Sequence, residues 1–154
     1  MNFLLLGSPG FHPDDFARFH PGGSLGKKLY MRVSDLIANN ETPAVLPEHT
    51  LKQVIVEMTE KRLGITAVTN PGNELLGIIT DGDLRRMLEK SVAIDQIGAK
   101  DIMTKNPKTI GPDELAVVAL DLLRKHEITQ LAVTDKGKYI GILHLHDLIR
   151  EGFI

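Results

Sequence analysis

The chain has 154 residues, 42% of them hydrophobic and 25% charged, which is ordinary for a globular protein of one domain or two small ones. Its net charge of −2 gives no electrostatic basis for binding nucleic acid or an anionic membrane, and the absence of cysteine excludes disulfides, thiol catalysis and thiolate metal sites. The apolar start at residues 3–6 is too short for a signal peptide or a membrane span, so we expect a soluble cytoplasmic protein with neither nucleic acid nor membrane as a partner.

The first 31 residues differ in composition from the rest of the chain. Glycine and proline recur throughout them, with a Gly-Gly pair at 22–23. One short helix is expected over 13–19, because its Pro-Asp-Asp opening places acidic side chains at the positive end of a helix. We interpret residues 1–31 as an irregular tail or linker.

Two copies of one pattern follow, over residues 32–91 and 92–154. Each copy has a short helical segment, an extended segment, an amphipathic helix, two strands around a turn and a final helix. The segments of the first copy are 33–37, 43–47, a helix after Thr50, 66–69, 75–80 and 82–90; those of the second are 99–103, 107–111, a helix through 115–122, 131–134, 139–143 and 146–151. Gly77 and Gly141 lie 64 positions apart, as do Asp83 and Asp147.

This duplication predicts an α/β fold of two βαββα repeats packed as a pseudo-symmetric pair. A unit of about 60 residues buries too little apolar surface to be stable alone, so we expect the two repeats to pack sheet against sheet. A capping box at Thr50 and Gln53 should open the first long helix. The side chains expected to face the sheets are Leu51, Val54, Ile55, Met58 and Arg62 in the first repeat and Leu115, Val118, Ala119 and Leu122 in the second.

The junction between strand and helix in the first repeat has the chemistry of a binding site. The hydroxyl of Thr80 and the backbone N–H groups around Asp81 would favour an anion at the helix N-terminus. The carboxylate of Asp83 could accept both hydroxyls of a ribose, and Arg85 and Arg86 add positive charge for a phosphate or carboxylate. The alternative is that these residues only cap the helix and complement its dipole.

The second junction differs, because His144 replaces the hydroxyl residue while Asp147 is kept. Histidine can donate to a phosphate or carboxylate and is charged near its ordinary pKa of about 6.5, so this site would suit a different or more acidic group. His144 and His146 would share one face of a strand and, with Asp147, could bind a metal, but no third histidine follows at a matching spacing. We expect no metal, and ordinary capping remains an alternative.

The Gly-apolar-apolar-Thr-x-x-Asp motif of residues 77–83, together with its copy, resembles cystathionine beta-synthase (CBS) domains, and the pair resembles a Bateman module. The resemblance covers roughly residues 32–154. It implies binding of adenosine nucleotides or related phosphorylated ligands in the clefts between the repeats, and regulation of an attached domain. The candidate ligand-binding residues are Thr66, Thr80, Asp81, Asp83, Arg85, Arg86, His144, His146 and Asp147.

Residues 15–18, 20–29, 80–86 and 144–147 also resemble the C-terminal part of D-arabinose 5-phosphate isomerases of Kdo (lipopolysaccharide) biosynthesis. In that family the His-Pro-Gly-Gly segment ends the sugar isomerase domain, and its histidine, here His20, is implicated in the active site. Isomerisation needs a base and a pocket for the phosphate, which one tail histidine does not supply. We therefore expect no catalytic residue and no isomerase activity in this chain alone, with His20 a solvated tail residue.

This second resemblance suggests the ligand and the partners. CMP-Kdo, the activated end product, would be a feedback ligand, and AMP or ATP is the generic alternative; no cofactor is required. The expected partners are the chain's own sugar isomerase domain and a second copy in a homodimer. Two alternatives remain open: an assembly module that binds no small molecule, and a free-standing regulator of a separate protein.

Overall fold

The structure is a computed structural model that describes residues 26, 29–90 and 93–154. Most of the expected tail, 1–31, and with it His20, lies outside the described residues. In the part of the chain that is described, no helix reaches the length and hydropathy needed to cross a lipid bilayer.

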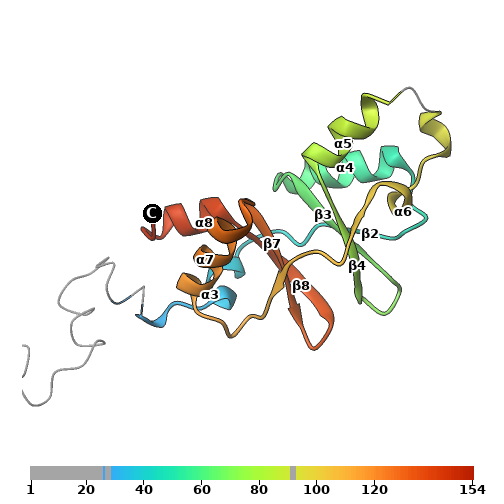
Figure 1. The fold of residues 1–154 in the computed structure, drawn as a ribbon. Helices are drawn as coiled ribbons and strands as arrows, with labels where there is room; N and C mark the ends of the chain where they lie inside the picture. Colours follow the sequence, from blue (N-terminus) through green and yellow to red (C-terminus); the bar gives the residue numbers. More distant parts are fainter. Residues whose placement is uncertain (1–25, 27–28, 91–92) are drawn as a thin grey trace, which may run out of the picture.

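The first half of the chain forms one helix–strand unit and the second half repeats it (Figure 1). The elements of the first half are α3 (Val33–Ile37), β2 (Ala44–Val45), α4 (Leu51–Lys61), β3 (Ile65–Thr69), β4 (Leu75–Thr80) and α5 (Asp81–Leu88). Those of the second are η1 (Ile94–Gln96), α6 (Ala99–Ile102), β5 (Thr104–Lys105), β6 (Thr109–Ile110), α7 (Ala116–His126), β7 (Gln130–Asp135), β8 (Lys138–His144) and α8 (Leu145–Arg150). This order confirms the predicted pair of βαββα repeats.

Each repeat builds its own sheet from one parallel and one antiparallel pairing. In the first sheet, of order β2-β3-β4-β5, β2 runs parallel to β3 and β4 returns antiparallel. The second sheet has the order β6-β7-β8 with the same directions. The extra strand β5 was not expected from the sequence; it pairs with β4 through Gly77 and Ile78 and so joins the second half of the chain to the first sheet.

The two sheets face each other across a shared apolar cluster, as predicted. Ile65 and Ala67 of the first sheet pack in one cluster with Ala132 and Ile142 of the second. Tyr139, also in this cluster, donates a hydrogen bond of 2.7 Å from its hydroxyl to the carbonyl of Pro43 across the interface. The long helices lie on the outer faces of this sandwich (Figure 1).

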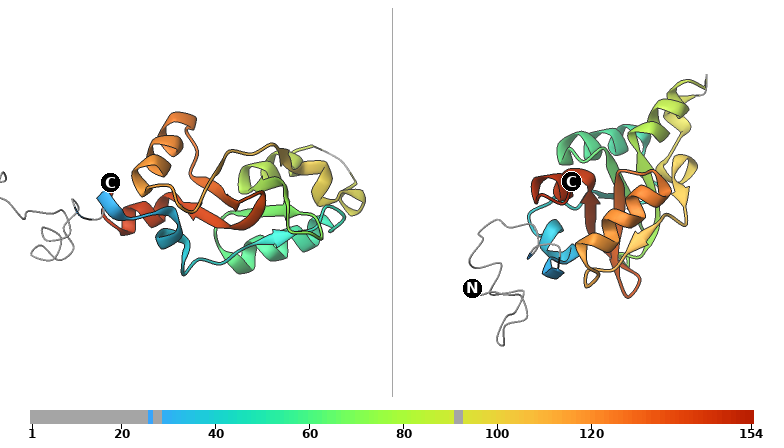
Figure 2. Two further views of the ribbon diagram at one scale, coloured as in Figure 1. Left: turned by 90° about the horizontal axis from the view of Figure 1, so that it is seen from below. Right: turned by 60° about the vertical axis from the view of Figure 1, so that its left-hand side comes forward.

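The short helices α3 and α6 are exchanged between the repeats. α3 precedes the first repeat but packs on the second, and α6 precedes the second repeat but packs on the first. Val33 and Leu36 of α3 belong to the core of the second repeat, beside α7 and α8 (Figures 1 and 2). Ala99 of α6 belongs to the core of the first repeat, and its N–H donates to the carbonyl of His49 at 2.9 Å. The halves are therefore joined by exchanged elements as well as by the sheet interface.

The capping box predicted for the first long helix is confirmed, because Thr50 accepts from the Gln53 N–H and Gln53 accepts from the Thr50 N–H. The predicted buried stripes are partly wrong. In α4, Ile55 is 38% exposed and the helix buries Leu51, Val54 and Met58. The helix α7 begins at Ala116 and buries Ala116, Ala119, Leu120 and Leu123, so its apolar face is turned from the expected one.

Candidate functional site

The junction from β4 to α5 is fixed by reciprocal hydrogen bonds between Thr80 and Asp83. The Thr80 N–H donates to Asp83 Oδ2 at 2.9 Å, and the Asp83 N–H donates to Thr80 Oγ1 at 3.3 Å. The Thr80 hydroxyl also donates to Asp83 Oδ2 at 3.1 Å. Thr80 is thus the N-cap of α5. Both residues have the capping role that the sequence analysis gave as the alternative, and this cap fixes the geometry of the junction.

The backbone N–H groups at this helix N-terminus are less available than the sequence suggested. The Asp81 N–H donates to the carbonyl of Gly64 at 3.0 Å, and that of Asp83 is used by Thr80. In the second repeat the Leu145 N–H donates in the same way to the carbonyl of Thr129 at 2.8 Å. An anion at either junction would therefore depend on side chains more than on the helix N-terminus.

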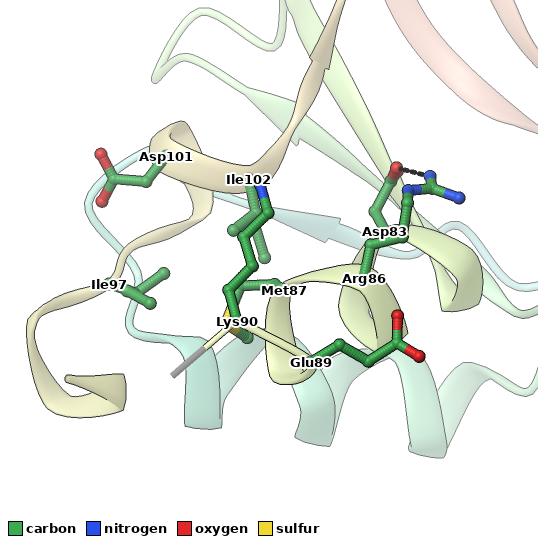
Figure 3. A pocket seen from close by; sticks show the side chains of 8 residues that line it. All are labelled: Asp83, Arg86, Met87, Glu89, Lys90, Ile97, Asp101 and Ile102. Atoms are coloured by element: carbon green, nitrogen blue, oxygen red, sulfur yellow. Dashed lines mark hydrogen bonds and ion pairs between the residues drawn. The ribbon is translucent and has the colours of Figure 1, made fainter. Parts of the chain in front are cut away.

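The carboxylate of Asp83 lies at the edge of a hollow of about 530 Å³ between α5 and the segment 97–102 (Figure 3). Three kinds of side chain line it: apolar, acidic and basic. They are Met87, Ile97 and Ile102; Asp83, Glu89 and Asp101; Arg86 and Lys90. Arg86 forms an ion pair with Asp83 Oδ1. Because its side chain is 66% exposed, the guanidinium can turn to another partner without the loss of buried contacts.

The hollow combines the groups that a nucleotide needs. Carboxylate oxygens accept ribose hydroxyls, guanidinium and ammonium groups bind phosphate, and apolar side chains pack against a base. Figure 3 shows the Asp83–Arg86 pair at one end of the hollow and Ile97 with Asp101 at the other. Asp101 is already engaged, since its Oδ2 accepts from the Gly98 N–H at 2.8 Å.

Four of the residues expected in the first site do not line this hollow, and one of them is Thr80, the N-cap of α5. Asp81 lines a separate hollow of about 270 Å³ that also contacts α4, with Gly64 close to its carboxylate. Arg85 is exposed on α5 and is not a lining residue. Thr66 is fully buried in β3, and its hydroxyl donates to the carbonyl of Ala67 at 3.0 Å. Of the first-site residues named from the sequence, the structure brings Asp83 and Arg86 to the hollow.

Sequence reasoning missed most of the lining. Met87 lies four positions after Asp83, which is helical spacing, so the periodicity of α5 could have placed both on one face; Lys90 follows the end of α5 at Leu88. Ile97 and Ile102 carry no such signal, because they reach the hollow only through the packing of α6 on the first repeat.

The second junction repeats the cap with a histidine. The His144 N–H donates to Asp147 Oδ2 at 2.8 Å, and His144 Nδ1 accepts from the His146 N–H at 3.0 Å. Because Nδ1 is an acceptor, the ring proton of neutral His144 is placed on Nε2. Burial, and next the charge of His146, lower the pKa of His144 from its usual 6.5, while Asp147 opposes this in part. With its pKa lowered, His144 is at neutral pH a neutral donor through Nε2.

The two histidines are neighbours for a different reason from the one expected. They do not share a strand face, because β8 ends at His144 and α8 begins at Leu145. The cap turns the chain so that the rings of His144 and His146 lie 4.3 Å apart, tilted by 35°. Within residues 26, 29–90 and 93–154, no three histidine or acidic side chains are arranged to bind a metal ion.

Asp147 is buried and holds three partners. Besides the His144 N–H, its Oδ2 accepts from Asn40 Nδ2 at 2.9 Å, and its Oδ1 lies 3.2 Å from the Arg150 guanidinium. Asn40 lies between α3 and β2, in the half of the chain opposite to Asp147, and was missed in the sequence analysis. No repeat position or spacing marks it out.

Comparison with known proteins identifies both copies. A family model described as the CBS domain matches residues 33–90 and 99–153. A solved CBS domain protein from Pyrobaculum aerophilum, complexed with AMP, has a TM-score of 0.70 at 23% identity, over 77% of this chain and 90% of that one. At this level of identity the likeness concerns the fold.

Curated relatives with higher identity share nearly the whole chain. Arabinose 5-phosphate isomerase KdsD of Francisella tularensis is 45% identical over 148 residues, which is 95% of this chain and 45% of that protein. The protein of the same name from Yersinia pestis is 39% identical over 151 residues, 97% of this chain and 46% of that protein. The chain therefore spans about half the length of the curated relatives it matches.

Proposed function

Because the chain belongs to the CBS domain family, we propose that it is a tandem CBS module that regulates an attached enzyme by binding a nucleotide at its first junction. The observation that carries the proposal is the position of Asp83. Its carboxylate borders the hollow of about 530 Å³ and is paired with the exposed guanidinium of Arg86. The likeness of the fold to a CBS protein complexed with AMP supports the class of ligand.

Each side chain has a chemical task in this proposal. Asp83 accepts the ribose hydroxyls, and Arg86 turns from Asp83 to the phosphate when the ligand enters, so that the partly exposed carboxylate exchanges one set of donors for another. Lys90, just beyond the C-terminal end of α5, adds a second cation to the lining. Met87 and Ile102 provide the apolar surface against which the base packs.

The regulated enzyme in this proposal is an arabinose 5-phosphate isomerase carried by the same polypeptide, because relatives of that name match the chain along about half of their length. Catalysis then belongs to a sugar isomerase domain and not to the CBS pair. Such a protein would work in the cytoplasm, where sugar phosphates and nucleotides are found together.

Two ligand types fit the hollow. AMP or ATP is supported by the AMP complex of the Pyrobaculum protein. CMP-Kdo is the feedback candidate: it offers a ribose for Asp83 and two acidic groups, a phosphate and a carboxylate, for Arg86 and Lys90. Both share the ribose and the phosphate, so Asp83 and Arg86 should matter for either.

Calorimetric titration of the chain with AMP, ATP and CMP-Kdo tests the proposal. Asp83→Asn should weaken binding of the preferred ligand at least tenfold, since the amide cannot accept two ribose hydroxyls as a carboxylate does. Asp81→Asn is the matched control, because Asp81 is on the same helix but borders a different hollow; its affinity should stay within twofold of the parent chain. Equal affinities for the parent and the Asp83→Asn variant would remove Asp83 from the site.

A second function, assembly of a homodimer, has one supporting observation. The outer helices expose apolar side chains, namely Ile55 and Val56 on α4, Leu88 on α5, Val118 on α7 and Ile149 on α8. Light scattering over a range of protein concentrations would test it. A dimer that persists on dilution, and that Val56→Glu converts to a monomer, would support assembly; a monomer at all concentrations would contradict it.

A further inference from the structure

The two junctions are copies in sequence, yet their aspartates are completed by different donors. At the first junction, Asp83 Oδ2 receives its second hydrogen bond from the hydroxyl of Thr80, its neighbour in the cap, at 3.1 Å. At the second junction, Asp147 Oδ2 receives it from Asn40 Nδ2 at 2.9 Å. A donor within the cap has thus been exchanged for one from the linker between α3 and β2.

The exchange follows from the histidine at the second junction. Nδ1 of His144 accepts from the His146 N–H and so cannot donate to Asp147 as the Thr80 hydroxyl donates to Asp83. Asn40 supplies the missing donor. Its Nδ2 also donates to the carbonyl of Ile142 at 3.1 Å, so the amide is held by β8 and by α8 at once.

The two aspartates also differ in access. The side chain of Asp147 is 4% exposed, and that of Asp83 is 12% exposed and borders the hollow of about 530 Å³. A ribose arriving at Asp147 would have to displace the Asn40 amide, which would leave the carbonyl of Ile142 without that donor. At Asp83 it would only turn the Thr80 hydroxyl and displace an exposed arginine. Leaving a buried polar group unpaired is costly, so the second junction resists a ligand.

We infer that one chain binds one nucleotide, at the first junction, and that Asn40 closes the second junction by occupying Asp147. This inference rests on the proposed nucleotide function and specifies which of the two clefts performs it. The second junction then has a structural role, because it holds the linker that follows α3 against the helix α8.

The stoichiometry and the location of binding test the inference on the parent chain, without any variant. Titration with AMP should give one equivalent per chain. Photo-crosslinking with 8-azido-AMP, followed by peptide mass spectrometry, should label peptides from residues 77–90 or 97–105 and leave residues 141–150 unlabelled. Two equivalents, or label on residues 141–150, would overturn the inference while the proposed function stands. No binding of AMP, ATP or CMP-Kdo would overturn both.

A double variant tests the role of Asn40 itself. Asn40→Ala with His144→Thr removes the amide and restores at the second junction the hydroxyl that the first one has. A second equivalent of AMP should then appear, with new label on residues 141–150, a change that a purely structural role of Asn40 would not produce. If the double variant, shown by circular dichroism to be folded, still takes one equivalent, Asn40 is not what closes the junction. The single variant Asn40→Ala should keep the first site's affinity within twofold, and a larger loss would also count against it.

Discussion

The side-chain amide of Asn40 donates to the buried carboxylate of Asp147 over 2.9 Å, between residues 107 positions apart in the chain. The bond fastens the linker that follows α3 to the N-terminal turn of α8. Since α3 itself packs in the core of the second repeat, one segment of the first half is held twice on the second. The two repeats are therefore expected to unfold together.

Loss of this bond should be visible in the stability of the protein. Asn40→Ala removes a donor from a buried carboxylate, and hydrogen bonds to charged groups contribute about 1.5–3 kcal/mol. We expect the free energy of unfolding, measured by urea denaturation, to fall by about that amount. Asn39→Ala, at an exposed neighbouring position, is the control and should change it by less than about 0.5 kcal/mol. Equal effects of the two changes would mean that the bond contributes little.

The equivalent glycines of the two repeats should respond differently to alanine. A Cβ on Gly77 would lie 2.7 Å from the carbonyl oxygen of Thr104 and 2.9 Å from Met103 Sδ, so backbone of β5 would have to move. A Cβ on Gly141 would meet the end of the Ile37 side chain at 3.1 Å, which can shift more easily. Gly77→Ala should therefore cost about 1–3 kcal/mol and Gly141→Ala clearly less, as measured by denaturant unfolding.

A larger loss in the free energy of unfolding for Gly141→Ala than for Gly77→Ala would contradict this prediction. Because Gly77 also pairs β4 with β5 close to the first junction, Gly77→Ala should in addition weaken nucleotide binding, whereas Gly141→Ala should not. Calorimetry on both variants checks this second expectation independently of stability.

The hydrogen bond from Tyr139 to Pro43 should contribute modestly to the interface between the sheets. Burial, with a smaller effect from the charge of Glu57, raises the pKa of Tyr139 above its usual 10.0, so the hydroxyl stays a donor at all working pH values. In Tyr139→Phe the Pro43 carbonyl keeps the Ala67 N–H at 3.1 Å, so we expect a loss of about 1 kcal/mol in the free energy of unfolding. Tyr30→Phe, at a largely exposed side chain, should have almost no effect. A loss above about 3 kcal/mol would show that the carbonyl does not keep its second donor.

The order of the elements could be predicted because the chain repeats itself. Gly77 and Gly141, and Asp83 and Asp147, mark the same two points in each copy: the strand before the junction and the helix after it. A pattern that is weak in one copy becomes specific when it recurs at a constant offset. The capping box at Thr50 could be predicted equally well, since it depends on residues only three positions apart in the sequence.

Contacts between distant segments could not be predicted in this way. Asn40 is a polar residue in a linker, and its partner Asp147 is chosen by the exchange of α3 onto the second repeat. The strand β5 has only two residues, which is too short for any alternation to appear. The same limit explains why Thr66 and Asp81 were expected at the first site although they do not line the hollow: their position depends on which face of an element meets the sheet.

The neutral state of His144 predicts how stability depends on pH. The pKa of His144 is lowered in the folded protein, chiefly by burial, so below its usual value of 6.5 the unfolded chain takes up a proton that the folded chain resists. The contribution of His144 to stability is therefore complete above pH 6.5 and is lost as the pH falls toward the lowered pKa of the folded state. His144→Asn keeps a side chain that can cap α8 but does not titrate, so the free energy of unfolding of this variant should fall less between pH 8 and pH 5.5 than that of the parent. Urea denaturation at several pH values gives both slopes, and the difference at pH 8 measures the change of cap alone. Parallel slopes would mean that the proton on His144 is not what links folding to pH.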